Sequence, residues 1–132
     1  MSGYSPKLLE HFRHPRNQGK IKNPDVVATV GNPMCGDIMR MYLKFGKNKK
    51  GEEIITDIKF ETLGCAAAIG VSSLLSTMVK GKTLKAAYRI SSQDIAKEAG
   101  GLPQHKYHCS VLADRALKKA IEEYWKKSEK SQ

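Results

Sequence analysis

The hydrophobic period of this 132-residue chain changes at Gly64. Before that glycine, residues 39–45 and 54–61 alternate apolar and polar side chains, and four of residues 26–30 are β-branched. Alternation is typical of a strand with one face in the core and one in water. After the glycine, residues 66–79 are small or apolar on every side, which is typical of a buried helix. The change predicts a sheet followed by helices.

The alternation also predicts which side chains face the core and which face water. In the first alternating run, Met39, Met41, Leu43 and Phe45 face the core and Arg40, Tyr42 and Lys44 face water. In the second, Ile54, Thr56, Ile58 and Phe60 share the dry face, and Ile55, Asp57, Lys59 and Glu61 share the wet one. The polar linker between the two runs predicts a hairpin.

Capping signals place the remaining helices. Ser5 before a proline predicts a first helix of about two turns, and residues 14–24 predict a surface loop. Residues 83–89 and 92–99 each begin at a Thr or Ser cap, and residues 113–124 carry an apolar stripe at helical spacing. The order predicts one domain over residues 1–132. Its fold class is α+β, a three-stranded antiparallel sheet with helices packed on one face.

Composition restricts the function classes. The first residues lack the apolar core of a secretory signal, and no run reaches the roughly 18 apolar residues of a membrane span, so we expect a cytoplasmic protein without a membrane partner. Disulfides are rare in that compartment, so the three cysteines are expected to remain thiols. The net charge of +10 favours acidic partners. Its basic residues are spread out without interleaved aromatic residues, which disfavours a nucleic-acid-binding module.

Each cysteine falls at the end of a predicted element. Cys35 lies in a turn between strands, whereas Cys65 and Cys109 lie where helices begin and where the helix dipole favours thiolates. Asp37 and His108 lie nearby in sequence, giving one ligand more than a tetrahedral site uses. Thiolates with imidazole suit zinc or iron–sulfur centres, and a carboxylate would be the most easily exchanged ligand. The surplus indicates a site that loads and unloads.

The same residues also fit simpler roles. Cys65 and Cys109 fit buried, inert thiols, because free cysteine behaves as a small hydrophobic residue. Asp37 fits an ordinary turn residue, and His108 fits a capping or surface histidine. The residues alone leave these alternatives open.

Three segments resemble the motifs of the IscU/NifU-type iron–sulfur cluster assembly scaffolds. They read GNPMCGD at 31–37, GCAAAI at 64–69 and KYHCS at 106–110. Tyr4 and the segment HPRNQG at 14–19 resemble the N-terminal part of that family. The third cysteine follows the second by 44 residues, a spacing that resembles the IscU form rather than the zinc-binding SufU form with its insertion.

The resemblance implies a scaffold or carrier rather than a turnover enzyme. A cysteine desulfurase of the IscS/NifS type would deposit sulfur as a persulfide on Cys109, iron would be added, and the resulting 2Fe-2S cluster would pass to acceptor apoproteins. Cys35, Cys65 and Cys109 would bind the cluster, with His108 or Asp37 as fourth ligand and Asp37 keeping it labile. The sequence leaves open whether the apo form holds zinc and whether the loaded form is a homo-oligomer.

One segment departs from the family pattern. The family sequence LPPVK, read by an ATP-dependent chaperone, is LPQHK here: Leu102, Pro103 and Lys106 match, whereas Gln104 and His105 differ. Loss of a proline loosens the extended shape of such a peptide. His105 could be a further metal contact or a solvated loop residue. The competing function is a zinc-binding structural or regulatory partner of a desulfurase.

Overall fold

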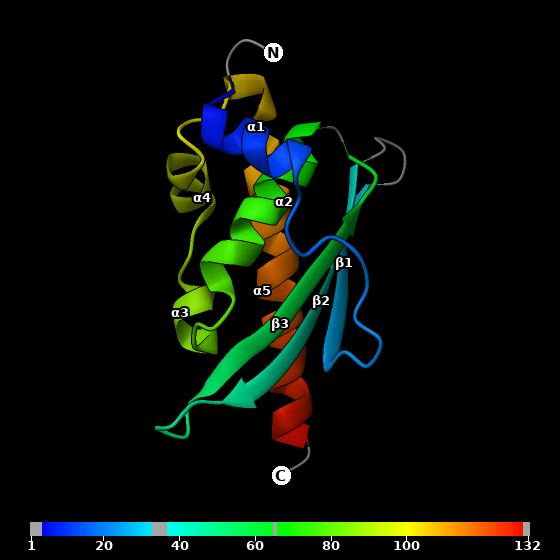
Figure 1. Ribbon diagram of the computed structural model, residues 1–132. Coiled ribbons are helices and arrows are strands. Elements are labelled where there is room, and N and C mark those ends of the chain that lie inside the picture. Colours follow the sequence, from blue (N-terminus) through cyan, green and yellow to red (C-terminus); the bar gives the residue numbers. More distant parts are fainter. Residues whose placement is uncertain (1–3, 33–36, 65, 131–132) are drawn as a thin grey trace.

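A computed structural model describes residues 4–32, 37–64 and 66–130 of the chain (Figure 1). Its centre is a three-stranded antiparallel sheet in the order β1-β2-β3. Helices α2 and α5 pack together against one face of this sheet, and α1 packs on α2. This architecture confirms the predicted α+β fold with helices on one face.

The strands are β1 (Val26–Asn32), β2 (Asp37–Lys47) and β3 (Glu53–Thr62). Most of the predicted alternation is confirmed, because alternate side chains of all three strands are buried beneath the helices. Burial of one such side chain contributes about 1.5–3 kcal/mol. The most deeply buried of them are Met39, Met41, Leu43, Ile58 and Phe60.

A β-bulge interrupts the pairing of β2 with β3 near the hairpin. Lys44 lies opposite Asp57, whereas the next residue, Phe45, lies opposite Ile55. Thr56 is therefore an extra residue of β3, and its hydroxyl donates a hydrogen bond to the carbonyl oxygen of Lys44 at 3.1 Å. One inserted residue shifts the alternation of every side chain beyond it.

The bulge changes which side chains of β3 reach the core. Ile55 and Ile58 are both fully buried, whereas Thr56 is exposed and Ile54 is half-buried. The prediction that Ile54 and Thr56 share the dry face with Ile58 is therefore wrong. Its physical reason is the bulge, which strict alternation cannot represent.

The outer face of the sheet also differs from expectation at one residue. Tyr42, predicted to face water, is only 7% exposed. It lies between its cross-strand neighbours Val27 and Lys59, and its hydroxyl donates to Oε1 of Glu61 at 2.5 Å. An aromatic ring flanked in this way is covered by its neighbours without belonging to the core.

The loop after the first helix covers the outer edge of β3, through residues 17–19, called here the edge segment. The amide of Gly19 donates a hydrogen bond to the carbonyl oxygen of Phe60 at 2.8 Å. The amide of Phe60 donates one to the carbonyl oxygen of Asn17 at 3.0 Å. The Asn17 side chain donates to Oγ of Ser76 on α2 at 2.9 Å. Asn17 has a positive φ of 63°, a conformation that asparagine tolerates better than most residues.

The first helix is fixed by a cap and by close packing. In α1 (Pro6–Arg13), the predicted cap Ser5 accepts a hydrogen bond from the amide of Leu8 at 3.0 Å. Leu8 packs against α2 (Ala66–Val79) at Gly70, where an added Cβ would lie 2.9 Å from Cδ1 of Leu8. The absence of a side chain at Gly70 therefore permits α1 to approach α2 this closely.

Two short helices precede the final one. Thr83 caps α3 (Leu84–Tyr88) as predicted. The cap of α4 (Ser92–Glu98) is Ser91, one residue before the predicted cap, because Ser91 forms a reciprocal capping box with Asp94. Within the described residues, no helix is long and apolar enough to span a membrane.

Candidate functional site

Cys109 lies at the third residue of α5 (Tyr107–Lys130), the long helix that packs across β1 and β2. Its side chain is 2% exposed and belongs to the hydrophobic core, which confirms the expectation that it faces the inner layer. His108 is exposed, and its Nε2 lies 3.8 Å from Sγ of Cys109. A buried sulfur and an accessible imidazole are therefore adjacent at one helix N-terminus.

The ends of the elements that carry the three motifs meet at one end of the molecule, called here the cysteine end (Figure 1). Asn32 at the end of β1 pairs with Asp37 at the start of β2. The carbonyl oxygen of Ile38 accepts hydrogen bonds from Oγ1 of Thr62 at 2.7 Å and from the amide of Leu63 at 3.2 Å. The fold thus brings the chain on either side of each cysteine position to the same end as the start of α5.

Several predicted ligands fall outside what the structure describes. Cys35 and Cys65 lie outside the described residues, and the side chains of Asp37 and His105 do too. Asp37 is the first residue of β2 and does not belong to a turn. Among residues 4–32, 37–64 and 66–130, no three acidic, histidine or cysteine side chains form a group that could hold a metal ion.

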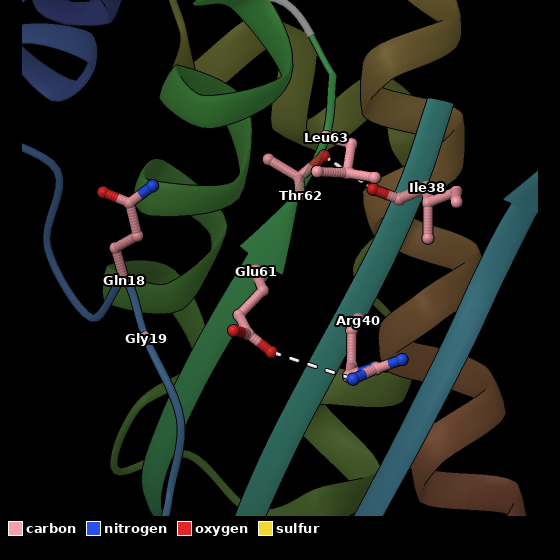
Figure 2. Close-up of a pocket in the computed structure, with 7 residues that line it drawn as sticks. All are labelled: Gln18, Gly19, Ile38, Arg40, Glu61, Thr62 and Leu63. Carbon is pink, nitrogen blue, oxygen red and sulfur yellow. Dashed lines mark hydrogen bonds and ion pairs between the residues drawn. The ribbon is translucent and has the colours of Figure 1, made fainter. Parts of the chain in front are cut away.

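A pocket of about 450 Å³ opens on the outer face of the sheet beside the cysteine end (Figure 2). It lies between the edge segment and strands β2 and β3, and Figure 2 shows the 4.0 Å ion pair of Arg40 with Glu61 across it. Ile38 and Leu63 also line it, and Leu63 is 76% exposed. Sequence reasoning missed this feature, although Leu63 is an apolar residue at an outward position of the alternating pattern.

The segment before α5 carries the residues that resemble a chaperone motif. Leu102, Pro103 and Lys106 are half-buried, and a 3-10 turn, η2 (Gln104–Lys106), leads directly into α5. The hydroxyl of the next residue, Tyr107, lies 3.4 Å from Oγ of Ser92 on α4. This contact ties the first residue of the cysteine-bearing helix to the neighbouring helix.

A buried polar network joins α1 to α2 near the cysteine end. Nδ1 of His11 lies 2.8 Å from Oγ of Ser73, and the same oxygen accepts the amide of Arg16 at 2.8 Å. Burial, followed by the positive charge of Arg16, lowers the pKa of His11 below its ordinary value of 6.5. Sequence reasoning also missed His11, although it lies three residues after Leu8 on the apolar stripe of α1.

Comparison with protein families matches residues 3–131 to the NifU-like N terminal domain. Among characterised proteins, the chain is 50% identical over 127 residues to "Iron-sulfur cluster assembly scaffold protein IscU 1" of Archaeoglobus fulgidus, covering 96% of this chain and 80% of that protein. It is 45% identical over 129 residues to "Iron-sulfur cluster assembly scaffold protein IscU" of Rickettsia prowazekii, covering 96% and 95%.

Solved structures share the architecture at lower sequence identity. A NifU-like protein (N-terminal) from Brucella abortus superposes with a TM-score of 0.66 at 23% identity, covering 93% of this chain and 94% of that one. A putative scaffold protein of the SUF system from Fervidobacterium islandicum gives a TM-score of 0.68 at 23% identity, covering 89% and 96%. At these identities the likeness concerns the fold.

Proposed function

The chain belongs to the NifU-like N-terminal domain family, and we propose that it serves as a scaffold on which an iron–sulfur cluster is assembled and then passed to acceptor proteins. The observation that carries the proposal is the position of Cys109, a buried thiol beside the exposed imidazole of His108 at the N-terminus of α5. Thiolate and imidazole are the donor types that iron–sulfur centres use in proteins. The cluster is the cargo of such a protein.

The ligand set of the proposal is Cys35, Cys65 and Cys109, with either His108 or Asp37 in the fourth position. Its support is the convergence of the flanking residues at the cysteine end, together with the motifs around each cysteine. The proposed cargo is a 2Fe-2S cluster. A carboxylate from Asp37 would be the hardest ligand of an otherwise soft set, so it would favour release.

Sulfur delivery would begin at Cys109. Its thiolate would attack the outer sulfur of a persulfide on a cysteine desulfurase, and the sulfur–sulfur bond of the donor would break with the donor thiolate leaving. Two electrons from a separate reductant would then convert the bound sulfane sulfur to sulfide. Because the thiol is only 2% exposed, the first turn of α5 must shift to admit the donor.

The proposed partners would approach the same end. Leu63, exposed beside the pocket on the outer face, supplies an apolar contact next to the cysteine end for the sulfur donor or an acceptor. Leu102, Pro103 and Lys106 would serve an ATP-dependent chaperone. Gln104 and His105 weaken that expectation, because they replace the residues that hold such a peptide extended.

The deciding experiment is anaerobic reconstitution of the purified protein with ferrous iron and sulfide. We expect visible charge-transfer absorption and equal amounts of bound iron and sulfide, with Cys109→Ala losing nearly all of the absorption while its far-ultraviolet circular dichroism stays unchanged. A colourless protein that binds only zinc would contradict the scaffold and favour the zinc-binding alternative.

The role of Asp37 is tested separately. Asp37→Ala should load a cluster that persists longer, and transfer to an apo-ferredoxin should become slower, because the exchangeable carboxylate is gone. Asp57→Ala, a carboxylate on β3, is the matched control and should transfer at the ordinary rate. Equal transfer rates for the Asp37 variant and the unmodified protein would contradict this role.

A further inference from the structure

Lysines gather at the end of the molecule opposite the cysteines, called here the lysine end. It consists of the β2–β3 hairpin, the loop after α2, helix α3 and the C-terminal part of α5 (Figure 1). The loop after α2 is held to β3 by the bridge between Ile54 and Thr83. Within the described residues, this end carries eight exposed lysines: Lys47, Lys49, Lys50, Lys80, Lys82, Lys85, Lys126 and Lys127.

Of these lysines, Lys80 lies 3.7 Å from Oδ1 of Asp57, whereas three glutamates at this end accept hydrogen bonds from neutral side chains. Glu53 accepts a hydrogen bond from the hydroxyl of Tyr124, and Glu122 accepts one from that of Tyr88. Glu52 accepts from the side-chain amide of Asn48 at 3.2 Å. Within the part of the chain that the structure describes, no carboxylate lies within ion-pair distance of Lys47, Lys82 or Lys85. The lysines of this surface therefore outnumber its carboxylates, and Lys47, Lys82 and Lys85 carry part of the excess positive charge.

A second pocket lies among these lysines. It has a volume of about 540 Å³ and lies between the hairpin, the start of α3 and α5. Lys47 and Lys85 line it, together with Trp125 and Leu84. Pockets that accept a small ligand or a side chain usually have volumes of about 300–1,000 Å³. The pocket can thus take one apolar side chain against Trp125, with Lys47 and Lys85 beside it and Glu52 and Glu53 in its wall.

The mixture of charges favours protein over nucleic acid. A phosphodiester backbone carries a negative charge at each nucleotide and would place charge over Glu52 and Glu53 in the pocket wall, whereas a peptide can place an uncharged side chain there and its carboxylates at Lys47 and Lys85. The cations around the pocket are lysines, whereas arginine is the residue best suited to bidentate phosphate recognition. Tyr124 packs on Phe45 with ring centroids 4.2 Å apart and Trp125 packs on Tyr88 at 5.2 Å, so each ring already has an aromatic neighbour in place of a stacked base.

Distance separates this surface from the cluster chemistry. Trp125 follows Cys109 by 16 residues of α5, which corresponds to about 24 Å along the helix axis. Charges are largely screened beyond about 10 Å at ordinary ionic strength. A partner on the lysine end would therefore leave the cysteine end uncovered and the electrostatics around Cys109 unchanged.

We propose that the lysine end is a docking surface for an acidic protein segment, with Lys47 and Lys85 contacting its carboxylates and the pocket beside Trp125 receiving one apolar side chain. The biological purpose rests on the proposed function, since a partner held here stays bound while a cluster is built or released at the other end. Binding itself requires no cluster and is tested without one.

Trp125 is the only tryptophan of the chain, so its fluorescence reports on the pocket. The probe is a blocked peptide with one phenylalanine flanked by glutamates, titrated into the apo protein at low salt. We expect a saturable change in emission that weakens as salt is raised. Lys47→Glu with Lys85→Glu should weaken the affinity by at least about tenfold, the direction expected for reversed charges at an interface.

The matched control is Lys20→Glu with Lys22→Glu, an equal change of net charge on the exposed loop before β1. It should leave the affinity within about twofold, since these residues lie outside the pocket. Equal weakening by both double variants would overturn the proposal, as would the absence of any emission change. The proposal would also be overturned if single-stranded DNA bound more tightly than the peptide and lost this binding in the Lys47 and Lys85 variant. Cluster loading of the same preparations is measured separately, so failure of the scaffold function would be visible on its own.

Discussion

The two ends of this molecule are built in different ways. At the lysine end, hydrogen bonds and rings join the elements to one another: Tyr124 of α5 packs on Phe45 of β2 and donates to Glu53 of β3. At the cysteine end, β1 and β3 end and β2, α2 and α5 begin, and the sequence motifs lie at these element ends. The difference teaches that the aromatic contacts between α5 and the sheet lie at the end of α5 away from the sequence motifs.

The separation has a physical advantage for a protein that must load and release a metal cluster. Ligands that exchange need chain segments that can rearrange, and rearrangement costs less at the ends of elements than inside a packed element. The opposite end can keep the sheet and helices in register during that change. Measurements on both ends test this comparison.

The largest effect is expected at the β-bulge. Ile55→Ala should lower the free energy of unfolding by about 2–5 kcal/mol, because the side chain is fully buried. Ile54→Ala is the matched control and should cost clearly less, since Ile54 is half-buried. Urea unfolding followed by circular dichroism measures both values.

The same pair of variants tests the independence of the ends. Under folding conditions, Ile55→Ala should still load iron and sulfide to the ordinary ratio per folded molecule. A loss of loading that exceeds the loss of folded protein would show that the two ends are coupled. An equal cost for the two isoleucines would contradict the reversal of faces at the bulge.

A smaller effect is expected for Tyr124→Phe. Loss of the hydrogen bond to Glu53 should cost about 0.5–1.5 kcal/mol. That hydrogen bond, with a smaller contribution from burial, raises the pKa of Tyr124 from 10.0 to about 12. The hydrogen bond adds to the free energy of unfolding below the pKa of Tyr124 in the unfolded chain, and this contribution is lost as the pH rises from 10 towards 12. The stability difference between variant and unmodified protein should therefore shrink over that interval.

The smallest effect is expected from His11, near the cysteine end. The pKa of His11 is lower in the folded protein than in the unfolded chain, so the unfolded chain binds more protons near pH 6. The free energy of unfolding is therefore highest above the unfolded pKa of about 6.5 and declines as the pH falls below it. Urea midpoints at pH 7 and pH 5 measure this decline. His11→Gln should flatten it, whereas the same change at the exposed His14 should not. A similar slope in both variants would exclude His11 as the source.

Much of the fold follows from local sequence patterns. The cap at Ser5, the apolar stretch of α2 and the alternation through Met39, Met41 and Leu43 each determine structure through neighbours in the chain. The inward position of Cys109 follows from the same helical spacing. These features were predictable because their causes are local.

The remaining features depend on contacts between distant residues. The bulge at Thr56 reflects how β2 and β3 pair, and no residue of β3 alone signals it. The burial of His11 requires Ser73, which lies 62 residues away in the chain. The ligand positions at Cys35 and Cys65 were proposed from motifs, and they stay predictions.

The edge segment has a consequence for how this protein behaves in a crowded solution. The strands of a small sheet can recruit a strand of another molecule wherever their outer peptide groups are open. Asn17 and Gly19 already engage both peptide groups of Phe60, so a foreign strand cannot pair there without displacing them. The loop before β1 therefore hinders edge-to-edge aggregation of the sheet at β3.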